Sequence, residues 1–407
     1  MFLDAVRRRN PGLLRFAALL HRSGVIPPNT FVFDRGAVRR NAERLAARAA
    51  TLGLGLYYMA KQIAYDAQLV AAIRASIAGA VAVDWMGAEA LLAQGATVRH
   101  VGHLVPVPLR LVPTLMTQAQ PEVWTLLDLE AAATINRAAL ALGRVQPVLL
   151  RVNGGDFFPG QEGGFAPEEV LRVAQAVARL PGLRLSGVTS YPCFTWDEGA
   201  ACYRPTANLE ALIASAERLR SAGFAIEQIN APGNTSLSVL PLLAQYGASH
   251  GEPGHALTGT TPEQSLGSSE EEPAVVYVSE VSAQLPGGQA LAYGGGLYAR
   301  AHARQALVGE SPEELEERAP VAVRFPPPQF IDYQCLLEPP PGRRLPTGAT
   351  VIMAFRFQLF VLRSYRAVVE QDGQGSWRLL SLTPPAWQPA SWLTDSSGIK
   401  DDERDAH

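Results

Sequence analysis

From about residue 30 the chain repeats one pattern of apolar and polar positions. A short run of β-branched or aromatic residues is followed by a polar or glycine-rich turn, and then by an alanine- and leucine-rich stretch with apolar residues every three or four positions. This alternation is typical of βα units. The runs that predict strands span residues 54–61, 79–85, 100–105, 122–127, 147–153, 185–192, 226–231 and 248–252. Helices are expected between them, for example over residues 37–50, 129–142, 168–180 and 209–222.

Eight such strands are the number that a parallel (β/α)8 barrel requires. A doubly wound open sheet produces similar local patterns, so periodicity alone leaves both architectures open. After the polar, acidic segment 263–273 the pattern changes to strand-like runs without alternating helices, over residues 274–281, 289–293, 351–364 and 367–370. Proline clusters between some of these runs are typical of an antiparallel β-domain.

These patterns predict an α/β protein with an N-terminal barrel and a smaller C-terminal antiparallel β-domain. The expected boundaries are an amphipathic lead-in over residues 1–29, a barrel over 30–262, a linker over 263–273, a β-domain over 274–395 and a charged, disordered tail over 396–407.

Composition narrows the classes of partner. The net charge of −3 and the pI near 6.2 provide no extended basic surface, so nucleic acid and anionic membranes are poor partners and a small polar ligand is expected. The three cysteines are odd in number and lack CxxC spacing, which disfavours a disulfide framework or a zinc site and suits a reducing cytoplasm. The N-terminal segment lacks the continuous apolar run of a signal peptide or membrane span.

Lys61 is the most conspicuous candidate for chemistry. Only Lys400 accompanies it in the sequence, so a general solubility role does not explain it. It ends the first predicted barrel strand, and active sites lie at the carboxyl ends of such strands. A lysine amine in that position is suited to hold an aldehyde cofactor such as pyridoxal phosphate, although a surface lysine at a helix start is the simpler alternative.

Other polar residues fall at the same ends of the remaining strands: Asp84, His103, Arg151, Asn153, Tyr191, Asn230, His250 and Glu252. Two glycine-rich turns follow the last two strands, over residues 230–236 and 250–260. Glycine lets the backbone approach an anion, and a following helix offers free N–H groups. Adjacent turns on the final two strands are where barrels bind phosphate, although Thr235 or Ser236 would also serve as an ordinary helix cap.

Several motifs resemble the fold-type III pyridoxal-phosphate enzymes, which include alanine racemases and the ornithine and diaminopimelate decarboxylases, and within them the YhfX-like group. The motifs are MAKQ around Lys61, VAVDW at 81–85, GHLV at 102–105, PGQEGGF at 159–165, TSYPCF at 189–194, HGEPGHALTGTTP at 250–262, YVSEVS at 277–282 and FRFQLFVLRS at 355–364. The resemblance implies a barrel that holds pyridoxal 5'-phosphate and a β-domain that completes the site, often across a homodimer.

The resemblance also implies roles for single residues. Lys61 matches the lysine of the internal aldimine, and Tyr65 and Ser236 match phosphate contacts. Gly254 and His255 match residues whose backbone amides reach the phosphate, and Tyr191 falls where relatives stack a histidine on the pyridine ring. Glu252 matches the carboxylate that keeps the ring nitrogen protonated. The expected cofactor-binding set is Lys61, Tyr65, His103, Arg151, Tyr191, Asn230, Gly233, Asn234, Thr235, Ser236, Glu252, Gly254 and His255.

Racemisation requires a second acid/base on the face opposite Lys61. The sequence offers Tyr298, Asp332, Tyr333 and Cys335, and the expected catalytic set is Lys61, Tyr333 and Cys335. Arg356 and Arg363 are candidates for a substrate carboxylate. No metal is expected, because histidines on barrel strands more often contact a cofactor or the core.

The resulting hypothesis is a racemase or epimerase that acts at the Cα of an amino acid through a quinonoid intermediate. A decarboxylase is the alternative, and a pyridoxal-phosphate homeostasis protein without turnover is the alternative of another class. The sequence does not identify the amino acid.

Overall fold

The computed structural model describes residues 2–294, 299–301, 303–327, 329–359 and 363–385. The chain divides into two compact units. The barrel unit comprises Ala42–Lys61 and Tyr65–Ala256. The sheet unit comprises Met1–Asn41, Gln62–Ala64 and Leu257–His407. Each unit is treated below by itself.

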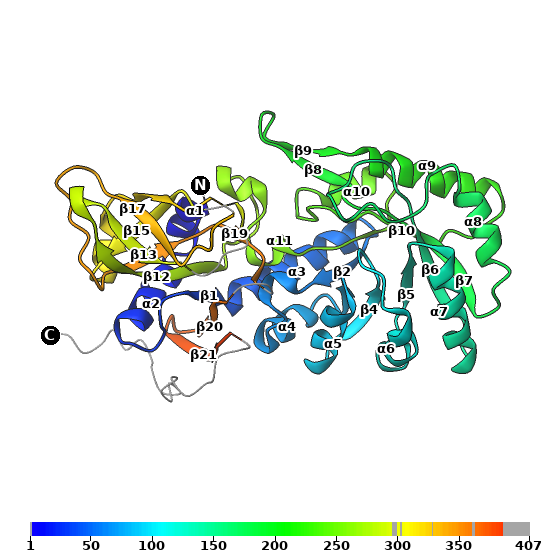
Figure 1. The fold of residues 1–407 in the computed structure, drawn as a ribbon, viewed down its shortest axis with the longest axis horizontal. Helices are drawn as coiled ribbons and strands as arrows, with labels where there is room; N and C mark the ends of the chain where they lie inside the picture. The colour runs from blue at the N-terminus through cyan, green and yellow to red at the C-terminus, as the bar shows by residue number, and fades with distance from the viewer. Residues whose placement is uncertain (1, 295–298, 302, 328, 360–362, 386–407) are drawn as a thin grey trace. The chain divides into compact units, whose positions relative to one another are not determined.

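The barrel unit contains a closed barrel of eight parallel strands (Figure 1). In order around the barrel they are β10 (Gln228–Asn230), β11 (His250–Gly251), β2 (Gly55–Met59), β3 (Gly79–Ala82), β4 (Thr97–Val101), β5 (Val123–Leu126), β6 (Gln146–Arg151) and β7 (Leu183–Thr189). All eight expected strands are therefore present, and closure excludes the doubly wound sheet. The (β/α)8 prediction is confirmed.

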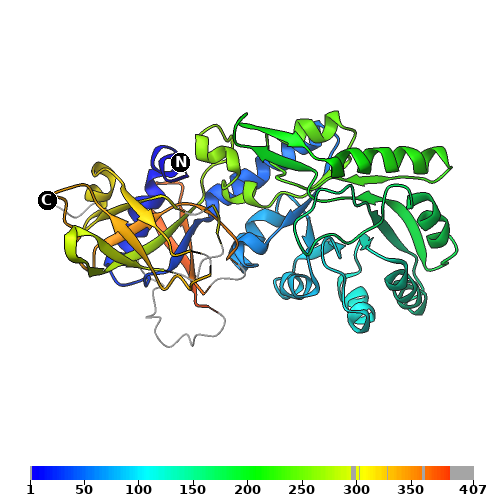
Figure 2. The ribbon, with the colours of Figure 1, turned by 45° about the horizontal axis from the view of Figure 1, so that its top comes forward.

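Helices connect these strands on the outside of the barrel, and Figure 2 shows α5, α6 and α7 side by side there. The helices are α3 (Arg35–Thr51), α4 (Ala67–Arg74), α5 (Trp85–Ala93), α6 (Val112–Ala119), α7 (Leu129–Ala141), α8 (Val170–Val177), α9 (Ala207–Ser221), α10 (Leu240–Gln245) and α11 (His255–Thr258). A short antiparallel hairpin, β8 (Phe194–Asp197) and β9 (Cys202–Pro205), follows β7.

Local sequence explains where several of these helices begin. Asp66, Asp84, Asp128 and Thr206 each stand immediately before a helix, and each side chain accepts a hydrogen bond from a backbone N–H of the first turn. Such residues satisfy donors that a helix start otherwise leaves unpaired. Asp84, which the sequence placed at the end of a strand, is therefore the cap of α5, with its Oδ1 2.7 Å from the Gly87 nitrogen.

The sheet unit is built on a nine-stranded sheet. Its order is β13 (Ala290–Tyr293), β17 (Gln334–Glu338), β16 (Val321–Arg324), β15 (Gln305–Gly309), β18 (Thr350–Met353), β12 (Val275–Gln284), β1 (Thr30–Asp34), β20 (Tyr365–Gln371) and β21 (Trp377–Thr383), and β13 also pairs with β12. The pairs are antiparallel except β1 with β20, so the expected antiparallel β-domain is confirmed apart from that parallel pair. The run expected over residues 351–364 is split into β18 and the two-residue β19 (Arg356–Phe357), which pairs with β14 (Ala299–Ala301).

The N-terminal segment belongs to this sheet unit, so the expected division at residue 30 is wrong. Helix α1 (Phe2–Arg9) contributes Leu3, and helix α2 (Pro11–Arg22) contributes Phe16, to the same apolar core as Val276 and Ile352. Strand β1, which was not among the predicted strands, lies between β12 and β20. Its five residues are all buried, which a central strand of a covered sheet requires.

The segment expected to be a polar linker is folded. The 3₁₀ turn Pro262–Leu266 opens it, and the Gln264 amide donates to the carbonyls of Gly259 (3.1 Å) and Glu271 (3.0 Å). Gln264 and Glu271 are both fully buried. The expected disordered tail at 396–407 lies outside the described residues.

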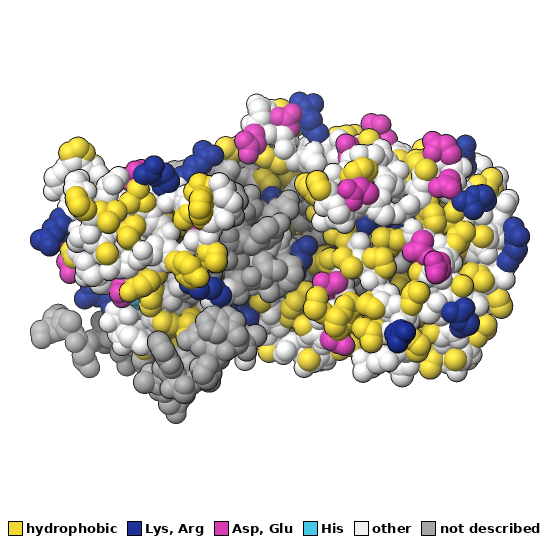
Figure 3. Space-filling view, viewed as in Figure 1, with side chains coloured by type: hydrophobic (Ala, Val, Ile, Leu, Met, Phe, Trp, Pro, Cys, Tyr) yellow, Lys and Arg dark blue, Asp and Glu magenta, His cyan; other side chains and the backbone are white. Residues whose placement is uncertain are grey.

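The charges on the surface and the hydropathy of the helices relate to the partners that the sequence disfavours, nucleic acid and membranes. On the face of the barrel unit in Figure 3, basic and acidic side chains are interspersed. Within the described part of the chain, no helix combines the length and the apolar character that crossing a membrane requires.

Candidate active site at the carboxyl end of the barrel

Lys61 and Glu252 come from neighbouring barrel strands. Strand β2 ends at Met59, and the half-buried Lys61 opens the following 3₁₀ turn, Lys61–Ile63. Strand β11 pairs with β2, and the buried Glu252 follows its last residue. Both side chains therefore start at the same end of the barrel, as the sequence predicted.

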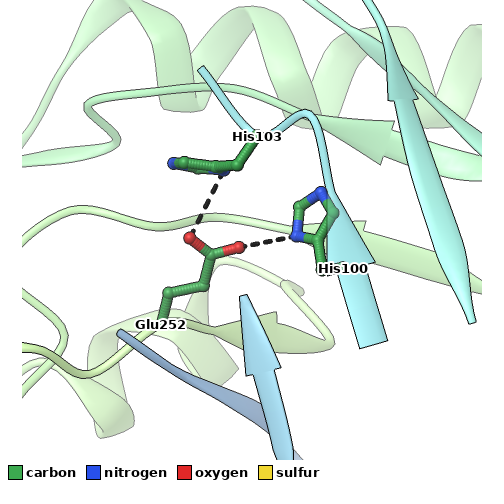
Figure 4. A group of neighbouring side chains, drawn as sticks. All are labelled: His100, His103 and Glu252. Atoms are coloured by element: carbon green, nitrogen blue, oxygen red, sulfur yellow. Dashed lines mark hydrogen bonds and ion pairs between the residues drawn. The ribbon is translucent and has the colours of Figure 1, made fainter. Parts of the chain in front are cut away.

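Glu252 is the centre of a buried polar cluster (Figure 4). One carboxylate oxygen, Oε1, accepts hydrogen bonds from His100 Nδ1 at 2.9 Å and Asn230 Nδ2 at 2.8 Å. The other, Oε2, has no hydrogen-bond partner and lies 3.3 Å from His103 Nδ1. The backbone N–H of Glu252 donates to Thr235 Oγ1 at 3.0 Å. The carboxylate is thus fixed at one oxygen and open at the other.

Charge in this cluster is set by burial and by close neighbours. Burial lowers the pKa of His103 to about 3 although the Glu252 carboxylate beside it acts to raise that pKa, so His103 is neutral at pH 7. Burial raises the pKa of Glu252, but its histidine neighbours and the hydrogen bonds on Oε1 outweigh this and leave the pKa below its usual value. The cluster therefore contains a buried carboxylate beside a neutral imidazole.

An aromatic side chain lies next to this cluster. The ring of Tyr191 meets His103 edge to face, with centroids 5.7 Å apart, and Phe158 lies 6.2 Å from Tyr191 on its other side. Arg151 donates to the carbonyls of Leu104 and Gln161, which ties the loops after β4 and β6 together. The structure thus brings His103, Arg151 and Tyr191 together, as expected.

The turn after β10 has the close approach that the sequence anticipated. Gly233 has φ +143°, and a Cβ there would lie 2.8 Å from the Cys193 nitrogen and 2.9 Å from that of Phe194. Asn234 adopts φ +51° and donates to the Phe194 carbonyl at 3.0 Å. Only glycine fits the first of these positions.

The helix expected directly behind Ser236 begins later, at Leu240. Ser236 Oγ accepts from the Val239 N–H at 3.3 Å and so closes the turn that precedes α10, whereas the residue that caps α10 is Val239. Gly254 is buried, and His255 opens α11. Tyr65, at φ +55°, places its hydroxyl over Gly87, where a Cβ would lie 2.6 Å away. The phosphate contacts of Tyr65, Ser236, Gly254 and His255 stay predictions.

The candidates for the second acid/base lie in the sheet unit, except that Tyr298 falls outside the described residues. Cys335 is 1% exposed on β17, and burial raises the pKa of its thiol to about 12. Tyr333 is 56% exposed, with the guanidinium carbon of Arg363 4.8 Å from its ring centroid. Exposure favours Tyr333 over Cys335 for proton transfer.

Sequence reasoning left two members of the cluster out of the site. His100 and Thr125 are buried, and His100 Nε2 lies 2.7 Å from Thr125 Oγ1. The strand expected to start at residue 100 in fact ends at Val101, which moves His100 from the start of a strand to its carboxyl end. The sequence feature that could have pointed to His100 is a histidine inside an otherwise apolar strand.

The cluster also has the composition of a metal site. His100, His103 and Glu252 each offer a ligand atom, and these atoms lie within 4.8 Å of one another. Two histidines and a glutamate are a known zinc ligand set. The absence of a metal thus stays a prediction.

Comparisons with known proteins agree with this architecture. Residues 33–262 match the family model of the alanine racemase N-terminal domain, and residues 276–379 match that of the YhfX-like C-terminal domain. YhfX of Escherichia coli (strain K12) is 39% identical over 367 residues, which cover 89% of this chain and 93% of YhfX. The chain belongs to the YhfX-like family of fold-type III proteins.

Solved structures share the fold of this YhfX-like chain at low sequence identity. D-threonine aldolase from Filomicrobium marinum aligns with a TM-score of 0.65 at 17% identity, covering 88% of this chain and 95% of that one. Alanine racemase from Clostridium difficile 630, in complex with cycloserine, aligns with a TM-score of 0.63 at 14% identity, covering 87% and 97%. D-threo-3-hydroxyaspartate dehydratase from Delftia sp. HT23 aligns with a TM-score of 0.62 at 16% identity, covering 88% and 97%. One architecture thus serves several reactions.

Proposed function

We propose that this protein is a pyridoxal-phosphate-dependent enzyme that acts at the Cα of an amino acid, as a racemase or epimerase. The observation that supports it best is the placement of Lys61 and the buried Glu252 beyond neighbouring strands of a barrel whose family includes pyridoxal-phosphate enzymes. An amine for an aldehyde and a carboxylate for a ring nitrogen are the two groups that this cofactor needs most.

The residues present fit the cofactor. Glu252 Oε2 is a buried oxygen without a hydrogen bond, which is costly unless a donor reaches it, and a pyridinium N–H is such a donor. Gly233 leaves no room for a Cβ because the backbone of residues 193 and 194 packs against it, and the glycine-rich turn 230–236 that contains it is the proposed cradle for phosphate. Lys61 would hold the aldehyde carbon, and Tyr191 would cover the ring.

Each residue then has a distinct task in the reaction. Bound pyridoxal phosphate draws electrons away from the substrate Cα. Lys61 would take the Cα proton on one face of the substrate. Glu252 holds the ring nitrogen protonated. Tyr333, beside Arg363, is the proposed proton donor for the other face, and the substrate carboxylate is assigned to Arg356 or Arg363.

The preference for racemisation rests on the two proposed proton carriers, Lys61 and Tyr333, one for each face of the substrate. Homodimerisation and a cytoplasmic location accompany the proposal as further predictions.

The first test concerns the cofactor. Purified protein incubated with pyridoxal phosphate is expected to develop a near-ultraviolet absorbance band, and borohydride should fix one cofactor on Lys61, as located by peptide mass spectrometry. Lys61→Ala should abolish the covalent adduct, while Lys400→Ala, at the other lysine of the chain, should retain it. Stoichiometric labelling of the Lys61→Ala protein would sink the assignment.

The second test concerns the reaction. The loaded protein is incubated with a panel of amino acids in deuterated water, and Cα deuterium and stereochemistry are read by mass spectrometry and chiral chromatography. Deuterium incorporation with inversion supports racemisation. Carbon dioxide release would replace it with decarboxylation, and binding without exchange for any amino acid would favour a carrier without turnover.

A further inference from the structure

A buried hydrogen-bond chain runs behind Glu252, away from its open oxygen. Thr125 Oγ1 lies 2.7 Å from His100 Nε2, and His100 Nδ1 lies 2.9 Å from Glu252 Oε1. His100 is 0% exposed, Thr125 3% and Glu252 6%. The three residues come from β4, from β5 and from the turn after β11. Because His100 lies between the other two residues, its ring is held by a hydrogen bond at each nitrogen.

The hydrogen-bond chemistry determines where the protons lie. An ionised carboxylate only accepts, so His100 Nδ1 must carry a proton to bond Oε1. The Thr125 hydroxyl at Nε2 can either donate or accept, so it fits the ring in either case. The opposite tautomer would aim a lone pair at the carboxylate. Glu252 thereby selects the Nδ1–H tautomer, and Thr125 holds the ring in the orientation that bonds Oε1.

The consequence for Glu252 is an asymmetric carboxylate. Oε1 already accepts from both His100 and Asn230, whereas Oε2 accepts from no described group. Figure 4 shows His100 and His103 approaching different oxygens of the same carboxylate. A carboxylate held by two donors at one oxygen keeps its other oxygen aimed in one direction.

We propose that His100, oriented by Thr125, is a positioning residue that aims Glu252 Oε2 at the pyridine nitrogen of the cofactor and keeps that nitrogen protonated. This rests on the proposed function. It adds two residues to the site, neither of which touches the cofactor. Their effect passes through Glu252.

The competing interpretation is a metal bound by His100, His103 and Glu252. The hydrogen-bond pattern favours the positioning role, because Asn230 also donates to Oε1 and His100 Nδ1 uses its proton on the same atom. A metal ligand would need that nitrogen deprotonated. The two interpretations therefore differ in whether His100 Nδ1 carries a proton.

The test begins with the cofactor-free protein, whose histidine tautomers are read from long-range ¹H–¹⁵N spectra after histidine labelling. His100 is expected as the Nδ1–H tautomer, and its signal is assigned by its loss in His100→Gln. Thr125→Val removes the hydroxyl while keeping the shape, and should shift or broaden the His100 signals because the ring is no longer held at Nε2. Thr125→Ser retains the hydroxyl and should restore them. A wild-type His100 protonated at Nε2 alone overturns the proposal.

The same variants are then loaded with ¹⁵N-labelled pyridoxal phosphate. The ring nitrogen should resonate as protonated in the wild type and in Thr125→Ser, and shift toward the unprotonated position in Thr125→Val. The dissociation constant for the cofactor should rise about tenfold in Thr125→Val, the effect of weakening one charged hydrogen bond. A general packing defect would weaken binding without moving the ring-nitrogen signal.

The outcomes separate this role from the proposed function. Wild-type protein that binds no pyridoxal phosphate overturns both. Wild-type protein that binds it with a protonated ring nitrogen, while Thr125→Val leaves the His100 signals, the nitrogen signal and the affinity unchanged, overturns the positioning role alone. Stoichiometric Zn²⁺ binding by the cofactor-free protein that is lost in His100→Gln would replace it with the metal site.

Discussion

Replacing Phe31 by alanine should destabilise the sheet unit through contacts with residues more than two hundred positions away. Phe31 is 1% exposed on β1, and its ring centroid lies 4.5 Å from that of Phe357, 5.0 Å from Tyr277 and 5.8 Å from Phe355. Truncating a buried phenylalanine removes its transfer free energy and leaves a cavity, which together cost about 3–5 kcal/mol. The rings around Phe31 cannot collapse into the space without leaving their own contacts.

Hydrogen exchange with mass spectrometry can localise this loss. Peptides from β12 and β20, which flank β1, should exchange faster in Phe31→Ala by about two to three and a half orders of magnitude, the equivalent of 3–5 kcal/mol. Peptides from barrel strands β5 and β6 should change less. Phe194→Ala is the matched control, because Phe194 is equally buried but belongs to the barrel unit. Unchanged exchange in β12 and β20, with faster exchange in the barrel, would refute the placement of the N-terminal strand.

Three further perturbations have expected outcomes. Gly233→Ala should weaken cofactor binding and lower the midpoint of thermal unfolding, because a clash with two backbone nitrogens adds to about 1–3 kcal/mol of backbone strain. Gly223→Ala is the control, since Gly223 has φ +90° with nothing within 4 Å of its Cβ position and should show the strain alone. Equal effects of the two substitutions would contradict the clash. The free energy of unfolding, measured by urea titration, should fall as the pH drops from 6.5 toward 4. The reason is that burial lowers the pKa of His103 to about 3 and that of His250 to about 4, so the unfolded chain takes up protons that the folded chain does not, at about 1.4 kcal/mol per pH unit for each histidine; a flat profile over this window would argue against two neutral buried rings. Asn41→Ala should lower the free energy of unfolding of the sheet unit by about 3 kcal/mol, because it leaves the carbonyls of residues 257 and 272 and the N–H of residue 272 without their hydrogen-bond partner. A loss below about 0.5 kcal/mol would show that these hydrogen bonds do not stabilise the unit to that extent.

The barrel could be predicted because its strands are buried on both faces. Runs such as Val123–Leu126 are largely apolar, and polar residues follow at their carboxyl ends. The sequence therefore shows both the strands and the end of the barrel at which the candidate site lies. Lys61 and Glu252 were found in this way. His100 was among the barrel histidines assigned to the cofactor or the core, and it was left out of the expected site because the expected strand began three residues late.

Pairing partners and helix starts were harder to predict. Strand β1 pairs Thr30 with Tyr365, and a run of apolar residues carries no information on a partner so distant in the chain. The helix expected after Ser236 starts at Leu240 because Ser236 caps an intervening turn and Pro241 suits the first turn of a helix. Such choices depend on tertiary contacts that local propensity does not encode.

The central position of β1 in the sheet affects how the chain folds during its synthesis on the ribosome. Segments made first, α1, α2 and β1, reach their sheet neighbour β20 only after residue 365 has been synthesised. The barrel strands, from residue 55 to residue 251, emerge long before that and can assemble while translation continues. At 5–20 residues per second, β1 therefore waits roughly 10–50 seconds for β12 and roughly 20–70 seconds for β20. During that interval the exposed Leu, Phe and Val side chains of this N-terminal segment make the nascent chain a client for chaperones.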